Sequence, residues 1–285
     1  MIEKHTYYFT SAGGIRLAAD WYPAGAKRRG VTIVYLHGGG LLYGVRDDLP
    51  RPYLQMLLAA GYDVLAPDYP LAPESALPEI LTVLQEQLEY YLQRDSRIGE
   101  EKINNDYVLF GRSAGAYLAF MLAGRMAVAP RALICLYGYT GLDVPEFAKP
   151  SAYYSKLAAV SIGQAEKLIG AAPVTYAPLE SRLSLYIHAR QTGRWPEYLG
   201  AQSEPQRFAL TEAELKQLPP LFLAAATEDP DVPYRCSKAL SRILPRAQML
   251  TVYGSEHDFD RNTNVPDSIK VYAAILKFLE QIFIL

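Results

Sequence analysis

A serine flanked by two glycines is the residue of this chain best placed to do chemistry. Ser113 lies in Gly-Arg-Ser-Ala-Gly, residues 111–115, directly after an apolar run and directly before an Ala- and Leu-rich stretch. The pattern predicts a strand, a sharp turn and a helix, with the serine at the apex. Side chains at 111 and 115 would collide across so tight a turn, and a serine held in a strained conformation suits a nucleophile. An ordinary Gly/Ser turn is the alternative.

A serine hydroxyl is a poor nucleophile at neutral pH, so it needs a base, usually a histidine oriented by a carboxylate. The chain has four histidines, at positions 5, 37, 188 and 257. Only His257 both follows a predicted core strand and comes after the serine and a strand-end acid, the order expected with this kind of turn. We therefore predict His257 as the base, with a solvated loop histidine as the alternative. A histidine base also predicts that kcat/KM falls at acid pH, with an apparent pKa within about one unit of 6.5.

The carboxylate that orients the histidine is expected on the loop after the preceding core strand, residues 221–227. That loop offers three acids, Glu228, Asp229 and Asp231. Asp231 also has a structural interpretation, because an aspartate there can cap the helix that follows.

Consecutive glycines after another core strand supply hydrogen-bond donors. His-Gly-Gly-Gly, residues 37–40, directly follows the apolar run 31–36. Bare backbone amides can approach a substrate closely, and each donor to a developing oxyanion contributes about 3–4 kcal/mol in a dry site. We predict that the amides of Gly39, Gly40 and Ala114 form an oxyanion hole. Phosphate binding is disfavoured, because the run has no Gly-Lys-Ser/Thr and opens no helix.

Strands and helices alternate through most of the chain and must position these residues. Their order predicts an α/β fold, a doubly wound and mostly parallel β-sheet with an antiparallel start. The expected strands are 5–10, 15–22, 31–36, 62–66, 107–110, 132–136, 221–226 and 248–253. The expected helices are 49–60, 77–91, 114–126, 234–244 and 269–283.

The alternation breaks once, over residues 143–218. This stretch lacks a buried-strand run and has helical pieces at 151–160, 162–169, 179–192 and 212–218. We expect one α/β core from 1–142 and 219–285, with 143–218 as a helical cap insertion over the strands' carboxyl ends. An extra helical lobe is the alternative.

Several residues are candidates for substrate contact, each with a structural alternative. Leu41 and Tyr139 lie near strand ends that face the expected cleft, and core packing explains them equally well. Four residues of the insertion face either the cleft or solvent: Tyr186, His188, Arg190 and Trp195.

Four motifs in order carry a family resemblance. They are His-Gly-Gly-Gly at 37–40, Asp-Tyr-Pro-Leu-Ala-Pro-Glu at 68–74, Gly-Arg-Ser-Ala-Gly at 111–115, and the late Asp and His, with Asp-Pro-Asp-Val-Pro at 229–233. Together they resemble the hormone-sensitive-lipase-like carboxylesterase group of α/β-hydrolases.

The resemblance implies Ser113 as nucleophile, His257 as base and Asp229 as the triad acid, with residues 68–74 supporting the oxyanion hole from behind. The chain departs from the group at Arg112, where an acidic residue is usual. It also has its insertion after the serine instead of a long N-terminal helical cap.

Composition is that of an ordinary globular protein. At 285 residues, with a formal net charge of −2, the chain gives no reason to expect nucleic acid or an anionic membrane as partner. No apolar run approaches the ~20 residues of a membrane span, and the N-terminus lacks a signal peptide's apolar core. Cys135 and Cys236 fit reduced thiols, so we expect a cytoplasmic protein.

The sequence thus predicts a serine hydrolase that cleaves a small carboxylic ester through an acyl-enzyme and needs no metal or cofactor. Hydrolysis of amides or short peptides by the same fold is one alternative. A non-catalytic ligand-binding protein on this fold is the other.

Overall fold

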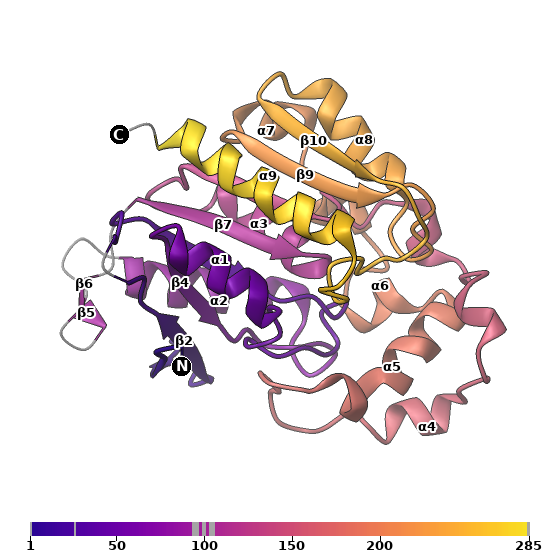
Figure 1. Ribbon diagram of the computed structural model, residues 1–285. Coiled ribbons are helices and arrows are strands. Elements are labelled where there is room, and N and C mark those ends of the chain that lie inside the picture. The colour runs from indigo at the N-terminus through magenta and orange to yellow at the C-terminus, as the bar shows by residue number, and fades with distance from the viewer. Residues whose placement is uncertain (1, 26, 93–96, 99–100, 103–105, 284–285) are drawn as a thin grey trace.

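An eight-stranded sheet forms the centre of the molecule (Figure 1). The computed structural model describes residues 2–25, 27–92, 97–98, 101–102 and 106–283. In order across the sheet, the strands are β1 (His5–Thr10), β2 (Arg16–Tyr22), β4 (Asp63–Pro67), β3 (Thr32–Leu36), β7 (Tyr107–Arg112), β8 (Ala132–Leu136), β9 (Leu221–Ala226) and β10 (Ala247–Val252). A separate small ribbon pairs β5 (Arg97–Ile98) with β6 (Glu101–Lys102).

The sheet is antiparallel at one edge and parallel elsewhere. β1 pairs antiparallel with β2, and β2 with β4. From β4 to β10 every pairing is parallel. Strands β3, β7, β8 and β9 are buried along their whole length, as expected for continuous apolar runs covered on both faces. The predicted α/β class, with its antiparallel start, is confirmed.

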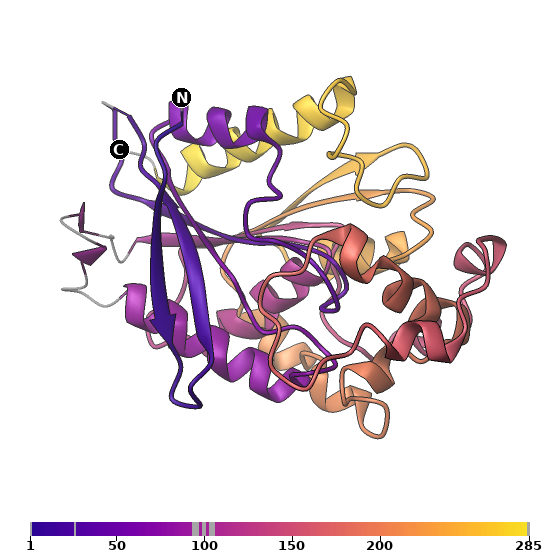
Figure 2. The same ribbon diagram turned by 90° about the horizontal axis from the view of Figure 1, so that it is seen from below.

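Helices cover both faces of the sheet. α1 (Arg51–Ala59) and α9 (Pro266–Ile282) lie together on one face, where the rings of Tyr53 and Tyr272 stack with centroids 3.7 Å apart (Figure 2). α2 (Leu77–Leu92), α3 (Ala114–Ala123) and α8 (Tyr234–Ile243) pack against the other face. α3 is buried all round and ends at Ala123, three residues short of the expected 114–126.

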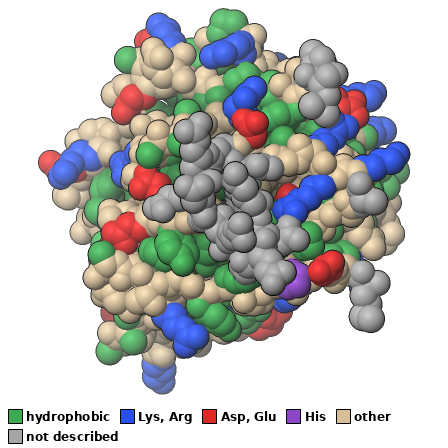
Figure 3. Space-filling model, turned by 90° about the vertical axis from the view of Figure 1, so that its left-hand side faces the viewer, with side chains coloured by type: hydrophobic (Ala, Val, Ile, Leu, Met, Phe, Trp, Pro, Cys, Tyr) green, Lys and Arg blue, Asp and Glu red, His purple; other side chains and the backbone are tan. Residues whose placement is uncertain are grey.

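The parallel strands point their carboxyl ends toward the insertion (Figure 1). Both termini lie near the opposite end of the sheet, where acidic and basic side chains are interspersed (Figure 3). Loops that leave β3, β7, β9 and β10 therefore meet at one edge, beside residues 143–218.

The insertion consists of short helices joined by irregular chain. Its elements are η1 (Pro145–Ala148), η2 (Tyr154–Lys156), α4 (Ile162–Glu166), α5 (Leu179–Thr192), α6 (Trp195–Tyr198), η3 (Pro205–Phe208) and α7 (Glu212–Gln217). α5 has the bounds that the sequence predicted, whereas the helix expected at 151–160 is wrong. In this segment the carbonyls of Tyr154 and Ala158 accept hydrogen bonds from the side-chain amide of Gln191 on α5, at 3.0 and 3.1 Å. They therefore bond to α5 and not within a helix of their own.

Substitution of Leu118 tests how much the packing around α3 contributes to the free energy of unfolding. Its side chain is fully buried, so Leu118→Ala is expected to lower the free energy of unfolding by roughly 2–5 kcal/mol through lost contacts and a residual cavity. Urea denaturation measures this loss. Val128→Ala is the control, because Val128 is 49% exposed. A loss of the same size in both variants would contradict the packing described for α3.

Candidate active site

The turn between β7 and α3 holds Ser113 in a strained conformation. Ser113 has φ 52° and ψ −118°, outside the conformations that side-chain-bearing residues prefer. The two flanking glycines are required by close packing. A Cβ on Gly111 would collide with the backbone of Gly115, and one on Gly115 would collide with the carbonyl of Leu36 on β3. The structure therefore explains both glycines of the motif.

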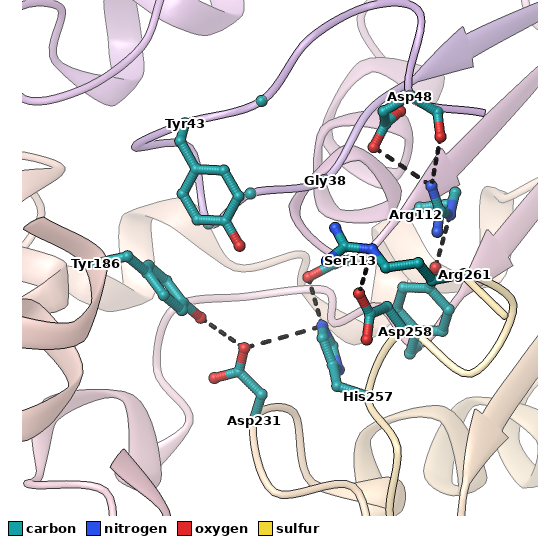
Figure 4. A pocket seen from close by; sticks show the side chains of 14 residues that line it. Gly38, Tyr43, Asp48, Arg112, Ser113, Tyr186, Asp231, His257, Asp258 and Arg261 are labelled. Atoms are coloured by element: carbon teal, nitrogen blue, oxygen red, sulfur yellow. Dashed lines mark hydrogen bonds and ion pairs between the residues drawn. The ribbon is translucent and has the colours of Figure 1, made fainter. Parts of the chain in front are cut away.

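His257 lies within hydrogen-bonding distance of both Ser113 and Asp229. His257 comes from the loop after β10 and Asp229 from the loop after β9. The Nε2 atom of His257 is 2.8 Å from Ser113 Oγ (Figure 4). Its Nδ1 atom is 2.7 Å from Asp229 Oδ2. The other Asp229 oxygen accepts the backbone N–H groups of Asp231 and Val232, at 2.8 and 2.9 Å. These two backbone hydrogen bonds hold the Asp229 carboxylate in the orientation in which it contacts the imidazole.

Asp231, another of the three acids on this loop, lies on the other side of the imidazole. Its Oδ2 is 3.9 Å from His257 Nε2 and accepts the Tyr186 hydroxyl at 2.6 Å. It does not cap α8, whose N-cap is Pro233. The structure thus separates the two aspartates: Asp229 contacts Nδ1, and Asp231 faces the cavity beside Nε2.

The charge state of His257 is set by these carboxylates. Burial opposes the charged ring, but Asp229, Asp231 and Asp258 outweigh it and raise the pKa of His257 to about 9. This value lies above the range around 6.5 that the sequence predicted. The sequence alone does not show that three carboxylates converge on one imidazole.

The glycine run lies directly against the serine. A Cβ on Gly38 would be 3.4 Å from that of Ser113, which places the start of the glycine run beside this serine. Gly39 and Gly40 have φ 105° and 59°, and a Cβ on either would collide with Tyr43 or Tyr186. In the described part of the chain, the amides of Gly39, Gly40 and Ala114 donate to no protein acceptor. Such free donors are what an oxyanion hole needs.

Residues 68–74 pack behind the glycine run. The Tyr69 ring stacks on His37, and its hydroxyl donates to the His37 carbonyl at 2.8 Å. The Ala72 amide donates to the carbonyl of Leu41 at 2.8 Å. Glu74 forms an ion pair with Arg182 at 2.8 Å, and this pair connects residues 68–74 to α5.

A small cavity opens in front of Ser113. It measures about 50 Å³ and is lined by Gly38, Gly39, Gly40, Tyr43, Gly44, Asp48, Arg112, Ser113, Tyr137, Tyr186, Asp231, His257, Asp258 and Arg261. Tyr186 of α5 is thus the insertion residue that faces the cavity. No local sequence pattern points to Tyr43, Asp258 or Arg261, because their position at the cavity depends on tertiary packing.

Other candidate contacts belong to the core instead. Leu41 is fully buried at φ 62°, and Tyr139 packs against Tyr117, Phe147 and Trp195, so neither lines the cavity. For both residues the structure fits the core-packing alternative. Three residues of the insertion are also buried and bonded: His188 to the Val160 carbonyl, Trp195 to the Gly40 carbonyl, and Arg190 to the Asp231 carbonyl.

Arg112 joins the serine turn to the histidine loop. Its guanidinium forms a buried ion pair with Asp260 at 2.9 Å and donates to the Tyr137 hydroxyl at 2.7 Å. Asp260 also accepts the hydroxyls of Tyr137 and Tyr272, at 2.6 and 2.7 Å. The ring of Tyr137 in turn packs edge-on against His257, with centroids 4.8 Å apart. The unusual residue beside the serine is therefore part of a network behind the imidazole.

The chain matches the model of a family described as having the alpha/beta hydrolase fold, over residues 33–259. The match covers most of the chain, which therefore belongs to this family. The resemblance to carboxylesterase-like α/β-hydrolases is confirmed, as is the prediction of a hydrolase. The described helices include none whose length and hydropathy would suit a bilayer span.

Solved structures share the whole fold. An alpha/beta hydrolase superfamily protein from Enterococcus faecalis is 32% identical, with a TM-score of 0.84 over 99% of this chain and 100% of that one. A Staphylococcus aureus protein of unknown function is 29% identical, with a TM-score of 0.88 over 98% of this chain and 99% of that one. A hyperthermophilic esterase from Pyrobaculum calidifontis, 19% identical, shares the fold with a TM-score of 0.68 over 98% and 85% of the two chains.

Curated relatives are much longer proteins. A non-reducing polyketide synthase from Penicillium rubens is 30% identical over 175 residues, which cover 56% of this chain and 7% of that protein. A second, from Aspergillus novofumigatus, is 27% identical over 170 residues, covering 55% of this chain and 8% of that protein. This chain thus matches only a small part of their length.

The Arg112–Asp260 pair is testable by a double-mutant cycle. Asp260→Asn removes the shorter ion pair of the buried guanidinium, which keeps only the contact with the partly exposed Asp48 at 3.3 Å, and is expected to lower the free energy of unfolding by about 3 kcal/mol. In R112M/D260N no buried charge is left unpaired, so the loss should be well below the sum of the two single losses. Urea denaturation gives all three values. Asp106→Asn is the control, since Asp106 and its partner Arg131 are both about half exposed. Simple additivity would contradict the pairing.

Proposed function

We propose that this hydrolase is a serine esterase that cleaves a small carboxylic ester through an acyl-enzyme on Ser113. The observation that carries the proposal is the contact of His257 with both Ser113 Oγ and Asp229, beside three unbonded backbone amides. Several solved structures that share the fold are esterases, which also supports an ester as the substrate of this chain. Residues 143–218 would act as a cap over the site, with Tyr186 as the residue that reaches the cavity.

In the first half-reaction, Ser113 Oγ attacks the ester carbonyl while His257 Nε2 takes its proton. Asp229 holds the ring orientation and stabilises the imidazolium. The carbonyl oxygen becomes an oxyanion that accepts from the amides of Gly39, Gly40 and Ala114. When the tetrahedral intermediate collapses, the bond to the alcohol oxygen breaks, and His257 returns its proton to that oxygen.

In the second half-reaction, water takes the place of the alcohol. His257 removes a proton from the water, whose oxygen attacks the acyl carbon. The ester bond to Ser113 breaks, Oγ regains the proton from His257, and the carboxylic acid leaves. Every proton and bond in this cycle is assigned to residues of the chain, the ester and water.

Labelling with a fluorophosphonate tests the nucleophile. The probe is expected to modify Ser113, as located by peptide mass mapping, and Ser113→Ala should lose labelling and at least about 10⁴-fold in kcat toward p-nitrophenyl acetate. Ser255→Ala is the control, because Ser255 lies near the site on the loop that carries His257. A labelled Ser255, or full activity without Ser113, would refute the mechanism. Turnover of aminoacyl anilides without ester turnover would point to the amide alternative.

The pH profile tests the base. Because the pKa of His257 is raised to about 9, the free enzyme carries a protonated ring at neutral pH, and that ring cannot accept the serine proton. We expect kcat/KM for p-nitrophenyl acetate to rise from pH 6.5 toward pH 9, after subtraction of the rate with S113A. Asp231→Asn removes one stabilising charge and should move the apparent pKa down. An apparent pKa at or below 6.5 in the unmodified protein would contradict this electrostatic account.

A further inference from the structure

Two spaces of very different size meet at His257. The cavity in front of Ser113 measures about 50 Å³. Next to it lies an open groove of about 720 Å³. Ser113, Gly39 and Gly40 line only the inner cavity. The residues shared by both spaces are Tyr43, Asp231, His257, Asp258 and Arg261.

Proton delivery determines which part of an ester enters which space. In the proposed mechanism His257 Nε2 protonates the departing alcohol oxygen, so the alcohol must leave on the side of the imidazole. His257 faces the outer groove as well as the inner cavity. The carbonyl oxygen must point toward the amides of the glycine run. The acyl chain is then left in the inner cavity, and the alcohol extends into the groove.

Tyr186 closes the inner cavity from the side of the insertion. Its ring packs so closely on the glycine run that a Cβ on Gly40 would collide with it. It also packs edge-on against the ring of Tyr43, with centroids 5.6 Å apart. Its hydroxyl donates to Asp231 Oδ2 at 2.6 Å. Asp231 also accepts the Tyr154 hydroxyl at 3.2 Å and pairs with Arg190 at 3.1 Å. The ring is therefore held in place from several sides.

The outer groove has two unlike walls. The insertion contributes apolar and aromatic side chains, among which Tyr153 and Leu157 are 48% and 42% exposed. The catalytic loops contribute polar and charged groups at Ser255, Glu256 and Asn262. A groove of this kind suits an alcohol with one apolar face and one polar face.

We propose that Tyr186 limits the acyl group to about two or three carbons, while the groove binds a larger, amphipathic alcohol. The natural substrate class is then the acetyl or propionyl ester of such an alcohol. This inference rests on the proposed esterase function.

Two substrate series test the two halves of the inference. With p-nitrophenol as the constant alcohol, kcat/KM for the acetate should exceed that for the hexanoate by about 100-fold, because a longer chain meets Tyr186. With acetate as the constant acyl group, 2-phenylethyl acetate should be cleaved faster than ethyl acetate. These alcohols have similar basicity, so the difference reports binding in the groove.

Matched variants test whether the acyl preference depends on Tyr186 and the alcohol preference on the groove. Tyr186→Ala should reduce the acetate preference to about tenfold or less and leave the alcohol preference in place. Tyr186→Phe, which keeps the ring, should retain most of the acetate preference. Leu183→Ala in the groove should reduce the alcohol preference and leave the acyl preference unchanged.

Equal rates for acetate and hexanoate in the unmodified protein would overturn the inference, as would an unchanged acyl preference in a folded Tyr186→Ala. Failure of the esterase proposal is a separate result: neither fluorophosphonate labelling of Ser113 nor turnover of any ester would be seen. If Tyr186→Ala does not fold, the unmodified protein, Tyr186→Phe and Leu183→Ala still decide the question.

Discussion

The structure of the site depends on how tightly the turn at Ser113 packs between β7, β3 and α3. There is no room for a Cβ at Gly111 or Gly115, so the backbones of the turn, the helix and β3 touch directly. This contact holds the serine at a positive φ and brings it beside the glycine run that leaves β3. A buried helix and a fully buried strand keep it there, since any relaxation of the turn would need the core to move.

Charge balance is the second constraint on the site. The imidazole of His257 lies between Asp229 and Asp231, and Arg112 and Asp260 lie buried behind it. Each buried acid has a partner: the backbone turn and the ring for Asp229, Arg190 and two phenols for Asp231, Arg112 and two phenols for Asp260. These pairings allow a negative environment at the histidine without an uncompensated buried charge. They also connect residues 143–218 to the loop after β9, because Tyr186 and Arg190 both contact Asp231.

Local patterns were enough to predict the sheet, the serine turn, the glycine run and His257, because each is encoded in a few adjacent residues. The choice of Asp229 over Asp231 needed the family resemblance, since both lie on the same loop two residues apart. Arg112 and Asp260 are far apart in sequence, and no local signal links them. For Leu41 and Tyr139 the sequence leaves cleft and core open, because a strand end does not reveal which way the chain turns next; the structure buries both. The helix expected at 151–160 does not form, and two carbonyls of this segment accept hydrogen bonds from the side chain of Gln191, a residue far along the chain.

The central claim is that Ser113 becomes covalently acylated with the help of His257. It is tested most directly by acid quenching of the protein within milliseconds of mixing with p-nitrophenyl acetate, followed by peptide mass mapping. The account predicts an acetyl group on Ser113 that forms with a burst of p-nitrophenol and is absent in His257→Ala. Acetylation at another residue, or steady ester turnover with no acetylated Ser113 in the unmodified protein, would contradict it.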